Sequence, residues 1–229
     1  MLTLVHFFII QYTPLHCSAL YNASPEAIFI LLSSPFAKQA FGMLDGENAT
    51  PFHLACASDS VGESTEVVEM LGTKDGGVLQ DRLGRTPLHI AAENPRSTKA
   101  IIKVLADINP KAAKIETTDN LMPLHVAVRK QADESVVKSL MKMYPKAALV
   151  IFEGDNTVLH EACQYKLSSS SIKAMLKEFP ELARQQNKYG NLPLHVATAY
   201  QVDAEIVEML LAVYPEGAMV QNRNADVPL

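Results

Sequence analysis

The feature that most constrains this chain is a short motif that returns at a nearly fixed interval. Its fullest form is Thr86-Pro87-Leu88-His89-Ile90-Ala91-Ala92. The motif histidines are His16, His53, His89, His125, His160 and His195, at intervals of 37, 36, 36, 35 and 35 residues. A seventh copy begins at Val227-Pro228-Leu229, the last residues of the sequence. A period of this size predicts a stack of similar two-helix units that bury their apolar faces against their neighbours.

Each position of the motif has a physical role. The proline suits the first helical position, where an amide hydrogen is not needed. The threonine before it, at positions 13, 50, 86 and 157, can cap the helix with its hydroxyl. We expect the leucine to be a core anchor, as in Leu124 and Leu159. Two residues after each histidine stands a small side chain that should face a neighbouring helix: Ser18, Ala55, Ala91, Ala127, Ala162 and Ala197.

Thr-Pro-Leu-His-x-Ala at this period resembles the ankyrin-repeat proteins over residues 13–229. The resemblance implies an all-α fold, a solenoid of helix-turn-helix repeats with projecting turns or short β-hairpins between them. We interpret residues 1–12 as an irregular N-terminal cap or the remnant of an earlier repeat, and 13–229 as one ankyrin-repeat domain. Its repeats are 13–49, 50–85, 86–121, 122–156, 157–191 and 192–226, with the start of a seventh at 227–229.

The second helix of four repeats is predicted by capping residues placed twelve positions before a proline. The caps are Thr98, Asp133, Ser168 and Asp203, and the prolines that should end the helices are Pro110, Pro145, Pro180 and Pro215. In the first repeat Ser24 should cap a helix that starts at Pro25, and in the second repeat the helix should end near Gly72. The turns between repeats need a positive φ, at Asn48, Gly84, Asn120, Asp155, Gly190 and Ala225. Alanine tolerates that conformation poorly, and Gln11 makes the first turn doubtful.

Bulk composition excludes several classes of protein. A net charge of −5 gives no reason to expect nucleic-acid binding. Residues 1–12 are apolar but too short to cross a bilayer, and a signal peptide would need a basic segment that is missing, so we expect no membrane insertion. The three cysteines, Cys17, Cys56 and Cys163, fit small core positions and not a disulfide framework. They point to an intracellular protein, in the cytoplasm or alternatively the nucleus.

The evenly spaced histidines invite a metal hypothesis that geometry disfavours. Neighbouring helices pack about 8–10 Å apart, whereas zinc needs nitrogens about 2.0–2.1 Å from one centre. His160-Glu161 begins like a zinc-protease motif, but Gln164 replaces the second ligand. The pair Gly76-Gly77 is only a turn signal. We therefore expect no enzyme, no metal, no cofactor and no small-molecule substrate.

The resemblance implies a protein-interaction module that binds an unidentified protein partner through its turn tips and a concave face lined by the first helices. The positions that match the family's contact sites are Arg82, Arg85, Glu93, Asp119, Arg129, Lys130, Gln164, Tyr165, Lys188, Tyr189 and Tyr200. Arg129 and Tyr165 should be partly exposed and add little to stability. One alternative is a regulatory or targeting segment of a larger enzyme or membrane protein, since the seventh repeat is incomplete. Another is a structural spacer, in which exposed tyrosines and arginines bind nothing.

Overall fold

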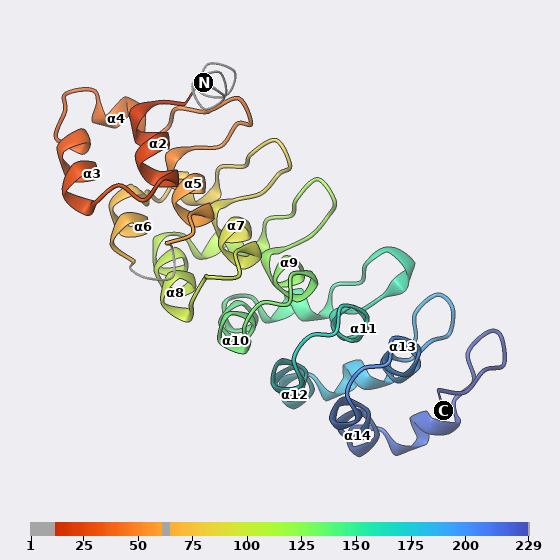
Figure 1. Ribbon diagram of the computed structural model, residues 1–229. Helices are drawn as coiled ribbons and strands as arrows, with labels where there is room; N and C mark the ends of the chain where they lie inside the picture. Colours follow the sequence, from red (N-terminus) through yellow and green to blue (C-terminus); the bar gives the residue numbers. More distant parts are fainter. Residues whose placement is uncertain (1–11, 61–64, 229) are drawn as a thin grey trace, which may run out of the picture. The chain divides into compact units, whose positions relative to one another are not determined.

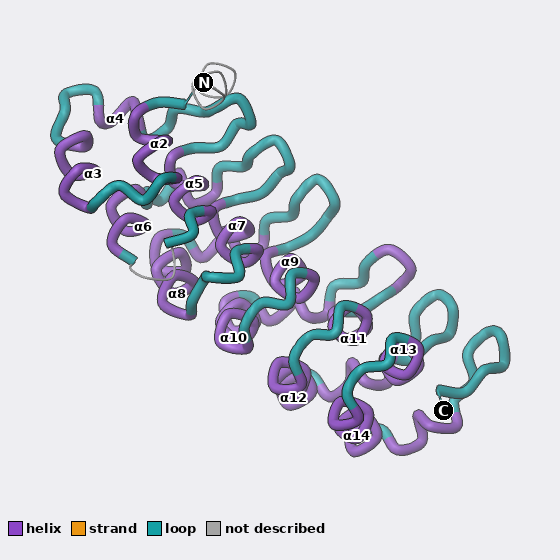
Figure 2. The backbone as a smooth tube through the Cα atoms, viewed as in Figure 1, coloured by secondary structure: helices purple, strands orange, loops and turns teal. Residues whose placement is uncertain are grey.

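The structure, a computed structural model, describes residues 12–60 and 65–228 and divides the chain into two compact units, Met1–Pro123 and Leu124–Leu229. The described residues form helices and turns without a strand, so the connections between repeats are projecting turns and not β-hairpins (Figure 2). The all-α prediction is confirmed. The predictions for residues 1–11, including the turn at Gln11, lie outside the described residues.

In the first unit, the short first helices of three repeats pack against one another, and the second helices form a second row behind them (Figure 1). The first helices are α2 (Pro14–Leu20), α5 (Pro51–Ala57) and α7 (Pro87–Glu93). The second row holds α3 (Pro25–Leu32), α6 (Glu66–Leu71) and α8 (Lys99–Ile108). Three short elements follow these helices: α4 (Ala37–Ala40), η1 (Gly76–Val78) and η2 (Pro110–Lys114).

The second unit repeats this two-row plan. Its first helices are α9 (Pro123–Arg129), which begins one residue before the unit boundary, α11 (Val158–Gln164) and α13 (Pro193–Ala199). Its second helices are α10 (Glu134–Met143), α12 (Ser169–Glu178) and α14 (Ala204–Val213). The 3₁₀ segments are η3 (Pro145–Leu149), η4 (Glu153–Asp155), η5 (Pro180–Arg184) and η6 (Pro215–Met219).

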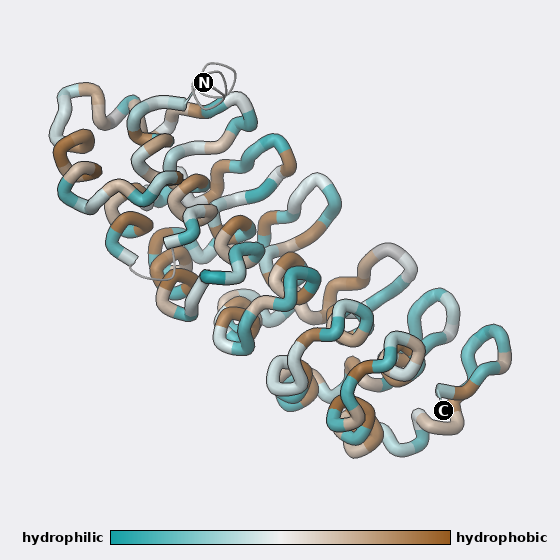
Figure 3. Tube along the Cα trace, viewed as in Figure 1, coloured by the Kyte–Doolittle hydropathy of each residue, from teal (hydrophilic) through white to brown (hydrophobic). Residues whose placement is uncertain are grey.

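The core follows the motif. The leucine position of the motif is buried in every repeat, with each side chain at most 3% exposed. The residues at this position are Leu15, Phe52, Leu88, Leu124, Leu159 and Leu194. The small slot after the histidine is buried from Ala55 onward and half-buried at Ser18. Figure 3 shows hydrophobic residues gathered on the helices and hydrophilic ones along most of the projecting turns. Cys56 and Cys163 are fully buried free thiols, whereas Cys17 is only half-buried.

The predicted helix boundaries are confirmed. Thr98, Asp133, Ser168 and Asp203 each stand at the N-cap of a ten-residue second helix, and α6 ends at the residue before Gly72. Of the four caps, Ser168 alone bonds the helix with its side chain, by accepting from Ser171 N. The prolines do more than end these helices. Each of Pro110, Pro145, Pro180 and Pro215 begins a five-residue 3₁₀ helix, where a residue without an amide hydrogen costs no bond. The sequence did not reveal these 3₁₀ segments.

Backbone conformation at the turns also follows the sequence. All six predicted turn positions have positive φ, including Ala225 at +66°. A second group of positive-φ residues was not predicted, because glycine is absent there. These residues follow first helices and are Asn22, Gln131, Lys166 and Gln201. At α11, for example, Lys166 N–H bonds Cys163 O and Leu167 N–H bonds Ala162 O, which is a Schellman helix end.

Candidate functional site

Most projecting turns are anchored at the base by a motif histidine, whereas His125 Nε2 bonds Ala147 O in η3 at 2.8 Å. In the repeat of α7, His89 Nε2 lies 3.0 Å from Leu121 O, at the base of the next turn along the chain. His89 Nδ1 lies 3.1 Å from Thr86 N and 2.9 Å from Thr86 Oγ1. The Thr86 N–H has to donate to Nδ1, so Nδ1 is the bare acceptor and Nε2 carries the single ring proton. The histidine is therefore neutral and ties one repeat to the next.

The same arrangement recurs around other motif histidines. His16 Nε2 bonds Ala49 O, His53 Nε2 bonds Leu79 O and Arg85 O, and His160 Nε2 bonds Asn191 O, at 2.9–3.1 Å. Burial lowers the pKa of His89 and of His160 to about 4, because the charged imidazolium would lose its hydration. Burial also lowers the pKa of His16, His53 and His195. These histidines therefore bond backbone groups near the turns and tie neighbouring repeats together.

In five of the six turns, a side-chain oxygen at the start of the turn holds the tip in shape. Asp81 is buried, and its Oδ1 accepts hydrogen bonds from Leu83 N at 2.9 Å and Arg85 N at 2.8 Å. Equivalent bonds to the residues two and four positions ahead are made by Asp45, Thr117, Asn187 and Asn222. Sequence reasoning missed this set. The signal was available, since an oxygen-bearing side chain stands five residues before the threonine slot in five of six turns.

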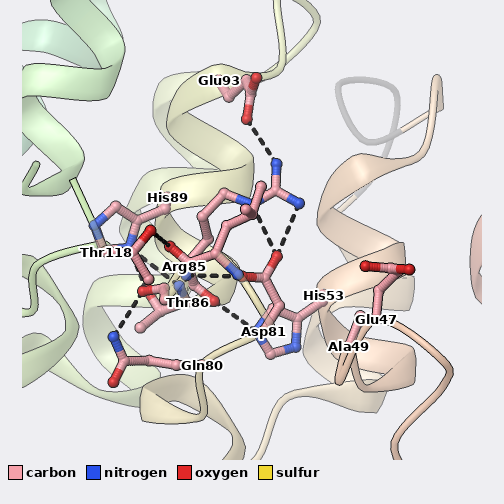
Figure 4. Close-up of polar contacts among 12 residues, drawn as sticks. Glu47, Ala49, His53, Gln80, Asp81, Arg85, Thr86, His89, Glu93 and Thr118 are labelled. Atoms are coloured by element: carbon pink, nitrogen blue, oxygen red, sulfur yellow. Dashed lines mark hydrogen bonds and ion pairs between the residues drawn. The ribbon is translucent and has the colours of Figure 1, made fainter.

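In the first unit, adjacent turns are joined by backbone bonds. Arg82 N–H donates to Glu47 O at 2.9 Å, and Thr118 N–H donates to Leu83 O at 3.0 Å. Gln80 bridges two turns, because its Nε2 lies 2.7 Å from Gly84 O and 2.9 Å from Glu116 O. Figure 4 shows Gln80 and Thr118 beside the turn that holds Arg85. The turn tips of this unit therefore form a connected rim.

Arg85 is built into that rim. Its guanidinium bonds Asp81 Oδ2 at 2.8 Å and Glu93 Oε2 at 3.1 Å, so it links the turn to α7 (Figure 4). Its side chain is 31% exposed. Arg82, by contrast, is 61% exposed and lies 3.5 Å from the exposed Glu47 carboxylate. Of the two predicted arginines in this turn, Arg82 is the one presented outward.

The second unit joins its turns in the same way. Lys188 N–H bonds Gly154 O at 2.9 Å and Arg223 N–H bonds Tyr189 O at 3.0 Å. Asparagine side chains add a second connection, from Asn187 Nδ2 to Asn156 Oδ1 and from Asn222 Nδ2 to Asn191 Oδ1, both at 2.9 Å. Tyr189 stands at the tip of its turn with 56% of its surface exposed, and Lys188 Nζ lies 5.0 Å from its ring centroid.

Phe152 is the exception among the turn-starting residues. It has no side-chain oxygen, and its ring packs edge-on against His125 with the centroids 4.2 Å apart. The Arg129 guanidinium lies 5.8 Å from the Phe152 ring centroid and 5.8 Å from that of Tyr165. It also forms a two-pronged ion pair with the buried Glu161, including Nη2 to Oε1 at 3.1 Å.

This aromatic and charged cluster changes what Arg129 can be expected to do. Its side chain is 29% exposed, but the guanidinium is the ion-pair partner of a carboxylate that is only 7% exposed. Removing Arg129 would leave the Glu161 charge uncompensated in a largely buried place, which costs stability. Contrary to the expectation from the sequence, we therefore predict that loss of Arg129 destabilises the fold, although its partial exposure was foreseen.

The predicted contact residues fall into two groups. Arg82, Arg85, Glu93 and Asp119 belong to the first unit, and the seven from Arg129 to Tyr200 belong to the second. Asp119, Lys130 and Tyr200 are exposed, Tyr200 by 45%. Gln164, Tyr165 and Lys188 are half-buried. No group of three or more potential metal ligands is found among residues 12–60 and 65–228. In the same part of the chain, no helix is both long and apolar enough to cross a membrane.

Comparison with known proteins decides the family. The profile of the family described as "Ankyrin repeats (3 copies)" matches residues 62–151 and 124–224. The chain belongs to the ankyrin-repeat family. No curated protein matches it. Among solved structures, it is similar to the ankyrin repeat domain of Bcl-3, a member of the IkappaB protein family. That match has 22% identity and a TM-score of 0.72 over 95% of this chain and 92% of that one.

A second solved structure, the human ASB11 ankyrin repeat domain, is 20% identical with a TM-score of 0.73. The match covers 95% of this chain and 90% of that one. At these identities the two likenesses establish the fold alone. Ankyrin repeats generally serve as protein-interaction modules and are typically non-catalytic.

Proposed function

We propose that this chain is a non-catalytic scaffold that binds a partner protein through its turn tips and the exposed ends of its first helices, the family's concave face. The turns support this proposal because their backbone groups are bonded within and between turns. A partner therefore meets a preformed surface and does not have to order a loop, which lowers the cost of binding. The same surface would serve if the repeats regulate a larger enzyme or membrane protein.

The observation that carries the proposal is the exposure of two large aromatic side chains on these elements of the second unit. Tyr189 lies at a turn tip and Tyr200 at the end of α13, and 56% and 45% of their surfaces are exposed. Tyrosine is among the residue types that most often anchor protein interfaces. Arg85 and Arg129 are already held by carboxylates, so we assign the primary contacts to Tyr189 and Tyr200 in this unit and to Arg82 in the other.

The cysteines support an intracellular site of action. Burial raises the pKa of the Cys163 thiol to about 12 and raises that of Cys56 as well. Such thiols are unreactive core groups, and all three cysteines are free. We therefore place the protein in the cytoplasm, with the nucleus as the alternative compartment.

The test compares two double variants of the full chain. Tyr189→Ala with Tyr200→Ala removes both anchors, and Glu205→Ala with Glu208→Ala changes two exposed residues on α14 of the same unit. Partners captured from cell extract by the tagged wild-type chain are identified by mass spectrometry, purified and titrated against each variant. At about 1.5–2 kcal/mol per anchor, the tyrosine variant should bind a genuine partner roughly 100-fold or more weakly. Equal affinity of both variants for every purified partner would refute the assignment.

A further inference from the structure

A groove lies on the second helices of the second unit, away from the turns described above. The helices α10 and α12 pack directly against each other (Figure 1). The groove between them has a volume of about 580 Å³. Met141 and Ala174 form an apolar floor. Both line the groove, and their low exposure of 4% and 7% places them at its bottom. This volume falls in the range of binding pockets, about 300–1,000 Å³.

The rim of the groove is basic. Lys138 and Lys142 project from α10, Lys173 and Lys177 project from α12, and all four are exposed. Residues four apart lie on one face of a helix, about 6 Å along its axis. Each wall of the groove therefore carries two ammonium groups above the apolar floor. The lining also contains two acidic residues, Glu134, which pairs with Lys138, and Glu178. Four lysines and two glutamates leave a local charge of +2 in a chain whose net charge is −5.

Two lysines four residues apart occur at these positions in α10 and α12 but not in α8 or α14. The positions that match Lys138 and Lys142 are Lys103 and Asp107 in α8, and Glu208 and Ala212 in α14. The exposed faces of α8 and α14 therefore carry mixed or acidic residues at the positions where α10 and α12 carry lysines. The basic rim coincides with the groove and is not a general property of the back of the repeats.

We propose that this groove binds an acidic amphipathic helix of a partner protein. Leucine- or phenylalanine-like side chains of the partner would cover Met141 and Ala174, and its Asp and Glu residues would meet the four lysines. A helix laid in an apolar groove is a common mode of peptide recognition. Among residues 12–60 and 65–228, the large hydrophobic side chains that are exposed all lie outside α10 and α12. This argues against a membrane surface as the occupant, because membrane-binding helices present apolar side chains for insertion.

This surface is independent of the tyrosines in the function proposed above. Opposite charges across an interface raise association rates and fix which partners bind. The groove would accordingly let one chain hold two proteins at once, one at the turns and one at the back of the second unit.

The experiment pans a phage library of random 16-residue peptides against the full-length chain, at 50 mM salt. The recovered peptides are synthesised and titrated against Lys173→Glu with Lys177→Glu, and separately against Lys142→Glu on the opposite wall. We expect a class of peptides in which Asp or Glu alternates with large apolar residues at helical spacing. Its affinity should fall at least tenfold in both variants and should weaken as salt is raised to 500 mM, because salt screens exposed charges.

The matched control is Lys99→Glu with Lys103→Glu, two exposed lysines four apart on α8. It makes the same change of net charge and should bind the peptides like the wild type. The proposal is overturned if no peptide class loses affinity in the groove variants, or if the class that does so lacks acidic residues. It is also overturned if phosphatidylserine vesicles, and not peptides, bind the wild type and are lost by the groove variants. Circular dichroism confirms that each variant is folded before it is titrated.

Discussion

At the scale of single residues, the motif histidine explains why the repeats hold together and why acid should weaken them. Its Nε2–H donates to a backbone carbonyl further along the chain, and in the repeats with His16, His53, His89 and His160 its Nδ1 accepts from the threonine slot. A second proton would have to sit on Nδ1, where an N–H already points. The neutral ring is therefore favoured by the hydrogen bond that Nδ1 accepts as well as by burial.

We expect the chain to lose stability as the pH falls from about 6.5 to about 4. In the folded state the pKa of His89 and of His160 is about 4, below the ordinary value of 6.5, so the unfolded chain binds more protons between these values. The stability is fully present above pH 6.5 and is lost as the pH approaches 4. Each such histidine contributes a slope of about 1.4 kcal/mol per pH unit to the free energy of unfolding.

Urea unfolding measured at half-unit steps of pH tests this expectation. His89→Gln removes one titrating group and should give a shallower slope than the wild type over the same range. A free energy of unfolding that is constant between pH 6.5 and 4 would contradict the neutral tautomer assigned to these histidines.

At the scale of elements, the sequence predicts the positive φ at the turns between repeats but not the positive φ that follows the first helices. The turn positions were predictable, because most of them hold Gly, Asn or Asp, which tolerate positive φ. The ends of α9, α11 and α13 were not, because Gln131, Lys166 and Gln201 adopt the same conformation at +53° to +55° without a glycine signature. Backbone hydrogen bonds at the helix end accompany the conformation there, as from Leu167 N–H to Ala162 O, and backbone bonds leave no mark on the residue types.

Replacing Lys166 with glycine should stabilise the chain. An L-residue in this conformation costs about 1–2 kcal/mol, whereas glycine gives up about 0.5–1 kcal/mol through its freer unfolded state. The net gain should be about 0.5–1 kcal/mol, visible as a higher urea midpoint. The control is Lys173→Gly in the interior of α12, which should lower stability by about 0.5–1 kcal/mol. If both substitutions destabilise equally, Lys166 is not strained.

At the scale of the whole molecule, periodicity predicted the repeats but not their individual features. The period, the leucine anchors and the starts of the second helices were all readable, since each recurs in register. Phe152 was not recognised, because it breaks the oxygen pattern at the turn starts, and that pattern had itself gone unnoticed. Arg129 was expected to contact a partner and to add little to stability. Its ion pair with Glu161 could not be recognised, because it joins residues 32 positions apart in the sequence. The lysine groove was missed because exposed charges on second helices look like ordinary solvated faces.

The last prediction concerns how stability is distributed along such an array. Leu159 is fully buried in α11, which packs against α12, α13 and η3. Leu159→Ala should cost about 2–5 kcal/mol, because a cavity opens in a layer that neighbouring repeats share. Five other repeats carry an equivalent buried anchor, yet they cannot compensate, since each unit of a repeat array relies on its nearest neighbours.

Leu159→Met keeps most of the volume and should cost less than about 1.5 kcal/mol. Hydrogen exchange should show the largest loss of protection in α11, α12 and α13 and the smallest in α2. A loss of stability below about 0.5 kcal/mol, which is ordinary for surface sites, or a uniform loss of protection along the chain, would contradict this nearest-neighbour description.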